Sequence, residues 1–187
     1  MRVEIVEDVE GKAPAPVFPL DENHLDLRAN PSAIGGVAAA RQYLPLRNFL
    51  TSVNSAESIF ATATATTKSD LPAVASAGSA YEFASQTRIV FAEPSLNWER
   101  KHYADLSSGL KELLERDAAD AVHAVLRISS CDFAAANRRG FCLSIRLVAA
   151  GSSAQQAELR WGLGLARIQQ ALLFRSRALK QHIDIAE

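Results

Sequence analysis

The sequence predicts an α+β fold in which two β-hairpins are each followed by a long amphipathic helix. Four segments (58–67, 81–92, 121–131 and 140–149) alternate apolar and polar residues with a period of two, which is typical of half-buried strands. An apolar stripe with helical spacing follows each pair of segments. We therefore expect two consecutive ββα units that form a mainly antiparallel sheet, with the long helices packed on one face.

The N-terminal part is expected to be a short strand followed by an extended arm. Residues 2–6 alternate polar and apolar side chains, whereas residues 10–24 contain one glycine and three prolines. Proline fixes φ and removes a hydrogen-bond donor, which favours extended or turn structure. We therefore divide a single structural domain into an N-terminal strand and arm, residues 1–30, and an α+β part, residues 31–187.

Two short helices should precede the first hairpin. The first should run from Pro31 to Tyr43, although Gly35 and Gly36 each disfavour it by about 1 kcal/mol relative to alanine. Pro45 cannot donate to a helical ladder and should interrupt it, so a second helix is expected over residues 46–53.

The first hairpin is predicted from residues 58–67 and 81–92. Strict alternation over the first segment should place alanines 61, 63 and 65 on one face and threonines 62, 64 and 66 on the other. In the second segment the bulky side chains Tyr81, Phe83, Ile89 and Phe91 share a face. A helix should follow, from Ser95 to about Arg116.

The second hairpin and the last helix follow the same pattern. A turn is expected over residues 137–140, and Ser152 or Ser153 should cap the helix with Gln155 or Gln156 in a capping box. Its buried stripe should be Trp161, Leu165, Ile168, Leu172 and Leu179. Residues 159–166 also alternate as a strand would, but the capped start favours helix.

The polar face of the sheet carries the candidate site. Arg88, Arg127 and Arg146 occupy polar-face positions on three strands, and His123 shares the face of Arg127. A register in which paired residue numbers total 273 would put Arg127 opposite Arg146, and Cys131 opposite Cys142. Because opposed like charges are destabilising, we expect solvent or a carboxylate such as Glu82 or Glu93 to offset them, or the face to bind an anion or an acidic partner surface.

No residue pattern predicts catalysis, a cofactor or a metal. Cys131 or Cys142 could act as a nucleophile with His123 as base, but no motif supports this. The acidic cluster Asp21, Glu22, His24 and Asp26 is typical of a solvated loop, and the series Glu99, His102, Asp105 lacks the matching helix that a two-metal site needs.

Composition restricts the partners. The chain has 187 residues, 20 of them basic and 21 acidic, so its net charge of -1 argues against a general affinity for nucleic acid or anionic membrane. Two cysteines, the lack of an apolar stretch of spanning length and the acidic residues near the N-terminus favour a cytoplasmic protein with reduced thiols and no membrane partner.

The expected function is that of a non-catalytic, self-associating binding or assembly module. Hairpins leave open sheet edges that tend to be paired or protected, and the absence of a catalytic motif favours binding. Two alternatives remain at this point. The chain could be a small-molecule carrier or sensor with a pocket between sheet and helices, or an enzyme whose site is not visible as a motif.

Overall fold

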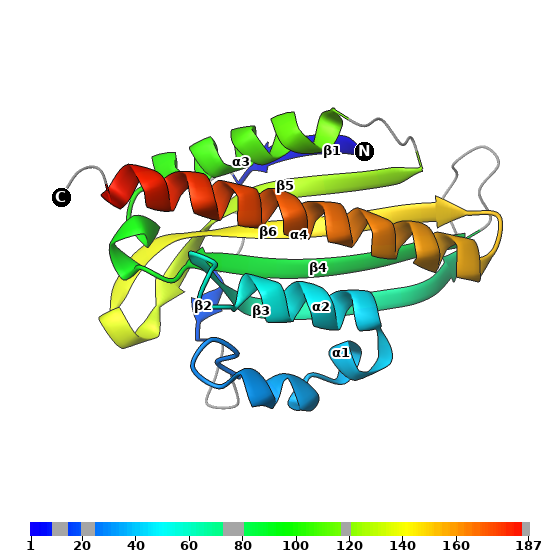
Figure 1. Ribbon diagram of the computed structural model, residues 1–187, viewed down its shortest axis with the longest axis horizontal. Helices are drawn as coiled ribbons and strands as arrows, with labels where there is room; N and C mark the ends of the chain where they lie inside the picture. Colours follow the sequence, from blue (N-terminus) through cyan, green and yellow to red (C-terminus); the bar gives the residue numbers. More distant parts are fainter. Residues whose placement is uncertain (9–14, 20–24, 73–80, 117–120, 185–187) are drawn as a thin grey trace.

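One mixed sheet organises the chain, and the computed structural model describes residues 1–8, 15–19, 25–72, 81–116 and 121–184 (Figure 1). In the described residues the strand order is β1-β5-β6-β4-β3, and β2 pairs with β5 as well. The strands are β1 (Arg2–Glu7), β2 (Val17–Phe18), β3 (Phe60–Pro72), β4 (Tyr81–Phe91), β5 (Val122–Phe133) and β6 (Arg138–Gly151).

The two predicted ββα units are both present. The hairpin β3–β4 leads into α3 (Arg100–Glu115), and the hairpin β5–β6 leads into α4 (Ala154–Asp184). The pairs β3–β4, β4–β6 and β5–β6 are antiparallel, whereas β1 and β2 run parallel to β5. The sheet is therefore mainly antiparallel, and the α+β prediction is confirmed.

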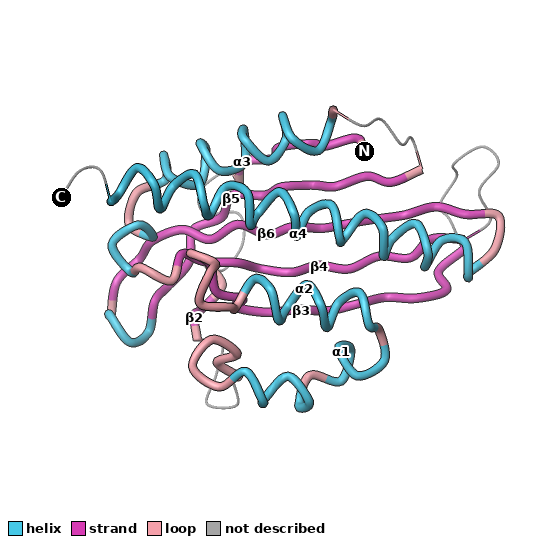
Figure 2. Tube along the Cα trace, viewed as in Figure 1, coloured by secondary structure: helices cyan, strands magenta, loops and turns pink. Residues whose placement is uncertain are grey.

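The long helices cover a single face of this sheet. Figure 2 shows α2 (Leu44–Val53), α3 and α4 side by side on the same side of the strands. Trp161 of α4 is fully buried against the sheet and donates a hydrogen bond from Nε1 to Ser85 Oγ on β4, at 2.8 Å. At Gly164 the helix comes so near the sheet that a Cβ atom would lie 2.8 Å from Val122. The sheet-facing side of α4 is thus tightly filled.

The final helix begins where the sequence predicts. Ser153 Oγ accepts a hydrogen bond from the Gln156 amide at 3.2 Å, while Gln156 Oε1 accepts one from the Ser152 amide at 2.8 Å. Residues 159–166 lie inside α4, which confirms helix over strand for that segment. Of the predicted stripe, Trp161, Leu165, Ile168 and Leu172 are buried. None of the described helices has both the length and the apolar character needed to cross a bilayer.

Two predicted helices are divided. The segment from Pro31 forms a 3-10 helix (η1, Pro31–Gly36) and then a separate turn of α-helix (α1, Ala38–Gln42), because the glycine pair disfavours a continuous helix. Before α3, a 3-10 turn (η2, Pro94–Asn97) likewise precedes the helix proper, which begins only at Arg100. Pro45 lies in the first turn of α2, where its missing N–H leaves no gap in the ladder.

The strict alternation predicted for β3 is wrong. Thr62 pairs with Ile89 but Thr64 pairs with Arg88, so Ala63 is an extra residue in a β-bulge. Thr62 consequently points to the helix side, where it is buried and hydrogen-bonded to Asn54 at the end of α2. Thr64 points to the opposite face, beside Arg88, because the bulge reverses the facing of the residues that follow it.

Only part of the predicted N-terminal arm can be compared. Within residues 10–24 the structure describes 15–19, where β2 pairs with the end of β5 and Phe18 packs edge-on against Phe133 at 5.8 Å. Residues 9–14 and 20–24, with most of the acidic cluster considered above, lie outside the described residues.

Candidate functional site

The three predicted arginines lie on the sheet face that the helices leave uncovered, although their register differs from the prediction. The numbers of each pair of facing residues on β5 and β6 sum to 271 and not to 273. Arg127 therefore lies opposite Ser144, and Arg146 lies opposite Val125. Cys131 faces Gly140 and not Cys142. The turn is earlier than predicted, because Ala134–Ala136 form a 3-10 turn (η3) and Asn137 adopts a left-handed φ of 43° before β6 begins at Arg138.

Rows of paired residues show how the arginines are arranged. One row joins Arg88 on β4, Ser144 on β6 and Arg127 on β5. The next row joins Gln86 on β4 and Arg146 on β6. Because alternate residues of a strand share a face, these five side chains are all on the outer face.

A carboxylate offsets one of these positive charges. Asp8, which follows β1, lies 2.7 Å from the guanidinium of Arg127 and also accepts a hydrogen bond from the Ser129 hydroxyl. The Ser129 hydrogen bond, followed by the nearby Arg127, lowers the pKa of Asp8 below its ordinary value against the opposing effect of partial burial. Arg127 is therefore an ion-paired residue that ties the end of β1 to β5.

Arg88 and Arg146 lack a comparable partner. Neither forms an ion pair or a hydrogen bond with any other residue in the described part of the chain. Arg88 is half-buried and Arg146 is exposed. Between them, Gln86 Nε2 donates a hydrogen bond to Ser144 Oγ at 2.9 Å. Of the three predicted arginines, one is thus neutralised and two are free of carboxylates.

His123 is separated from this group. It pairs with Val148, one row beyond Arg146, and its Nε2 lies 3.6 Å from Glu4 Oε2 on β1. That separation is longer than a hydrogen bond. His123 shares the face of the arginines, as predicted, but it lies beside β1 and not between the two unpaired guanidinium groups.

The cysteine hypothesis is not supported by the geometry. Cys131 and Cys142 are buried with Val90 and Phe133 in a second, smaller apolar cluster on the outer face. Contact with Cys142 together with burial raises the pKa of the Cys131 thiol above its ordinary value. His123 is eight residues away along β5, a span of about 26 Å in an extended strand, so it cannot act as the base. No group of three or more metal-ligating side chains gathers within the described residues.

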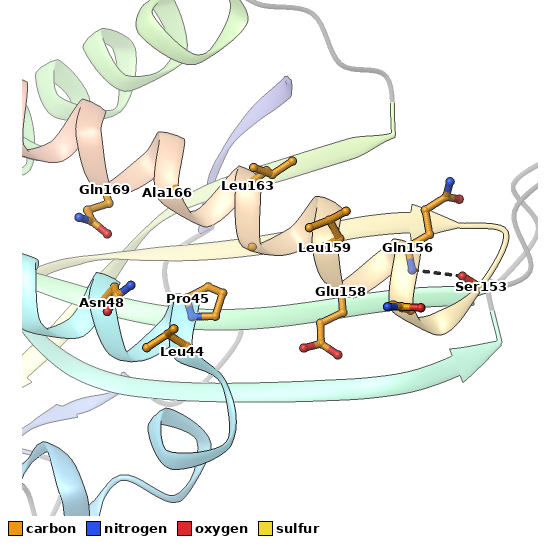
Figure 3. Close-up of a pocket in the computed structure, with 12 residues that line it drawn as sticks. Leu44, Pro45, Asn48, Ser153, Gln156, Glu158, Leu159, Leu163, Ala166 and Gln169 are labelled. Carbon is orange, nitrogen blue, oxygen red and sulfur yellow. Dashed lines mark hydrogen bonds between the residues drawn. The ribbon is translucent and has the colours of Figure 1, made fainter.

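A second candidate surface lies on the outside of the helix layer, and the sequence analysis missed it. An open groove of about 950 Å³ separates the start of α2 from the first half of α4. Figure 3 shows Leu44 and Pro45 on one wall and Leu159 and Leu163 on the other, with polar side chains including Glu158 around them. A groove lined by apolar side chains together with several polar groups is typical of a binding surface.

The groove belongs to an unusually exposed apolar region. Leu44, Leu159, Leu163 and Phe174 are 58–65% exposed, whereas no other large apolar side chain in the described residues exceeds 40%. All four lie on α2 or α4. Leu159 and Leu163 fall outside the buried stripe of α4, so this helix is apolar on two sides. That two-sided pattern is the only sign of the surface in the sequence, and it does not show whether another element covers the second side.

The space between sheet and helices offers less room. Trp161, Leu165, Ile168 and Leu172 fill it from α4 and are at most 2% exposed. A carrier pocket at that interface is therefore less well supported than binding on the outer surfaces. Comparison of the chain with protein-family models, curated proteins and solved structures finds no match.

Proposed function

We propose that this chain is a self-associating binding module that forms a symmetric dimer through the outer surface of α4. The observation that carries the proposal is the gathering of the four most exposed large apolar side chains of the described residues, Leu44, Leu159, Leu163 and Phe174, on α2 and α4. Large apolar side chains left exposed on neighbouring helices mark interaction sites, because covering them removes apolar area from water.

A second copy of the chain is the occupant that fits this surface. The groove beside Leu159 and Leu163 lies near the start of α4, and the exposed Phe174 lies nearer the end of the same helix. Leu163 and Phe174 are 11 residues apart, about three helical turns and about 16 Å, so they point to the same side of α4. In an antiparallel pair, a two-fold axis would place each Phe174 in the partner's groove, which is the self-complementary arrangement that dimers require.

Molar mass in solution tests the proposal. We expect light scattering to give twice the chain mass of 20.2 kDa at micromolar concentration. Leu163→Asp should yield monomer, because a symmetric dimer loses two buried leucines worth about 1.5–3 kcal/mol each, or about 100-fold or more in dissociation constant. Val17→Asp, at an apolar side chain that is 40% exposed away from α4, is the matched control and should remain dimeric.

Either of two results would overturn the proposal. One is a monomeric wild-type chain across the accessible concentration range. The other is a dimer that Leu163→Asp leaves intact while its circular dichroism spectrum matches that of the wild type, since the dimer would then use another surface.

A further inference from the structure

The open face of the sheet holds a second surface whose chemistry points to a ligand. Gln86 and Arg88 on β4 pair with Arg146 and Ser144 on β6, respectively, so the four residues occupy the corners of a square on the outer face. We call it the β4–β6 square. Gln86 and Ser144 are joined across one diagonal by a 2.9 Å hydrogen bond, and the arginines stand at the ends of the other diagonal.

The spacing allows both guanidinium groups to reach one small ligand. Diagonal neighbours on adjacent antiparallel strands are about 7–8 Å apart, within reach of long side chains. Each arginine presents a planar fork of donors that matches a carboxylate or a phosphate group in a bidentate geometry. Two such forks on one diagonal can therefore hold a single oxyanion between them.

The charge of the square is not balanced by the described residues. Asp8 accompanies Arg127, but Arg88 and Arg146 form no ion pair there. The acidic side chains on the same face lie elsewhere. Glu4 is two strands from Arg146, on the far side of Val125, and Glu82 is two side-chain rows from Gln86. Two like charges on a diagonal repel, so an anion placed between them would relieve that repulsion.

The surroundings of the square can supply further hydrogen-bond donors. The Ser144 hydroxyl accepts from Gln86, which leaves its own proton able to donate. Thr64 and Thr66 on β3 continue the two rows beside Arg88 and Gln86. The Ala63 bulge is what turns Thr64 to this face. The helices α2, α3 and α4 all lie on the other face, so none of them covers the square (Figure 1).

We propose that the β4–β6 square binds an oxyanion, held between the guanidinium groups of Arg88 and Arg146. The shared chemistry is a compact group with two or more equivalent oxygens, either a phosphate monoester or the carboxylate of an acidic segment. Because the square and the α4 groove lie on opposite faces, this binding is independent of dimer formation.

Arginine side-chain NMR on the full chain tests the proposal. At pH 7 and low ionic strength, where charges are least screened, inorganic phosphate and acetate are titrated separately while the Nε–Hε resonances are followed. We expect saturable shifts of two arginine resonances. Arg88→Gln and Arg146→Gln should each weaken binding at least about 10-fold, since hydrogen bonds to charged groups are the strong ones. Arg41→Gln, at an exposed arginine of α1, is the charge-matched control and should bind as the wild type does.

The two arms distinguish the source of the oxyanion. Tighter saturation by phosphate supports the site as one for a phosphate monoester, and tighter saturation by acetate supports it as one for an acidic segment. Shifts that grow linearly without saturating in both arms would overturn the proposal. So would an Arg41→Gln variant that weakens binding as much as the substitutions in the square. The thermal midpoints of all three variants should match that of the wild type, because Arg41 and Arg146 are exposed and Arg88 forms no ion pair or hydrogen bond in the described fold.

Discussion

A cysteine placed at position 166 tests the antiparallel dimer at its two-fold axis. If Phe174 enters the partner's groove at Leu159–Leu163, the axis must cross α4 midway between them, at positions 166–169. Ala166 is exposed and lies on the groove side of the helix. Two Ala166→Cys side chains would then be offset along the axis by only about 2–8 Å, at 1.5 Å per residue. A disulfide needs Cβ atoms about 3.5–4.5 Å apart, so it can form only where the two copies of a residue have a small axial offset of this kind.

Glu158→Cys is the matched control, since it is exposed on the same helix but far from the axis. Its two copies would be about 25–32 Å apart along the helix direction, too far to bridge. The native Cys131 and Cys142 are buried and should not compete. Mild oxidation followed by non-reducing electrophoresis should give a covalent dimer for Ala166→Cys alone. Equal cross-linking at both positions, or efficient cross-linking only at position 158, would refute the antiparallel arrangement.

Two further predictions concern the fold that supports these surfaces. Asn97 is buried and bonds to the Phe91 amide at 2.8 Å, the Phe91 carbonyl at 2.9 Å and the Tyr103 hydroxyl, so Asn97→Ala should cost about 3 kcal/mol or more in urea unfolding. Tyr103→Phe, which spares the two Phe91 bonds, should cost about 1 kcal/mol, and a larger loss there than at Asn97 would contradict the assignment. The lowered pKa of Asp8 should stabilise the fold above pH ~3.8, and this contribution disappears as the pH falls through the lowered value. The urea midpoints of the wild type and Asp8→Asn should therefore differ at pH 7 and converge at low pH; a constant difference would show that Asp8 does not titrate as described.

The hairpins could be predicted because burial on one face imposes a period of two. In β4, the large side chains Phe83, Ile89 and Phe91 leave no doubt which face is apolar, and all three are buried. In β3 the same reasoning failed at Ala63. Alanine and threonine are both small enough for either face, so alternation there does not fix which residues point to the core. The hydrogen bonds of Asn54 to Thr62 come from a separate helix and decide the facing.

The sequence predicts which face of the sheet carries the candidate site, but not which residues lie opposite one another on it. Side-chain alternation brings Arg127 and Arg146 to one surface under any β5–β6 register of odd total, and Arg88 joins them under any β4–β6 register of even total, as in the structure. Which residues lie opposite one another depends on where the turn begins, and that position is set by the left-handed Asn137. The actual β5–β6 register differs from the predicted one by two residue numbers. Arg127 therefore does not lie opposite Arg146, and Ser144 lies between Arg88 and Arg127.

The apolar groove could not be located from sequence spacing alone. The periodicity of α4 correctly marks Trp161 and Leu165 as buried, but it does not say whether a neighbouring element covers Leu159 and Leu163. That depends on the position of α2, which packs beside α4 and leaves the outer side of both helices open. Exposure is here a property of the tertiary arrangement.

The one-sided covering of the sheet has a consequence for valency. A pair joined helix to helix would be back to back, with its two bare strand surfaces directed outward in opposite directions. Such a particle would present two identical oxyanion-binding faces, and could bridge two partners or grip one multivalent partner at both ends. Because the second attachment would then be intramolecular, avidity could exceed the affinity of a single face by a factor of about 10²–10⁴ without any additional contact.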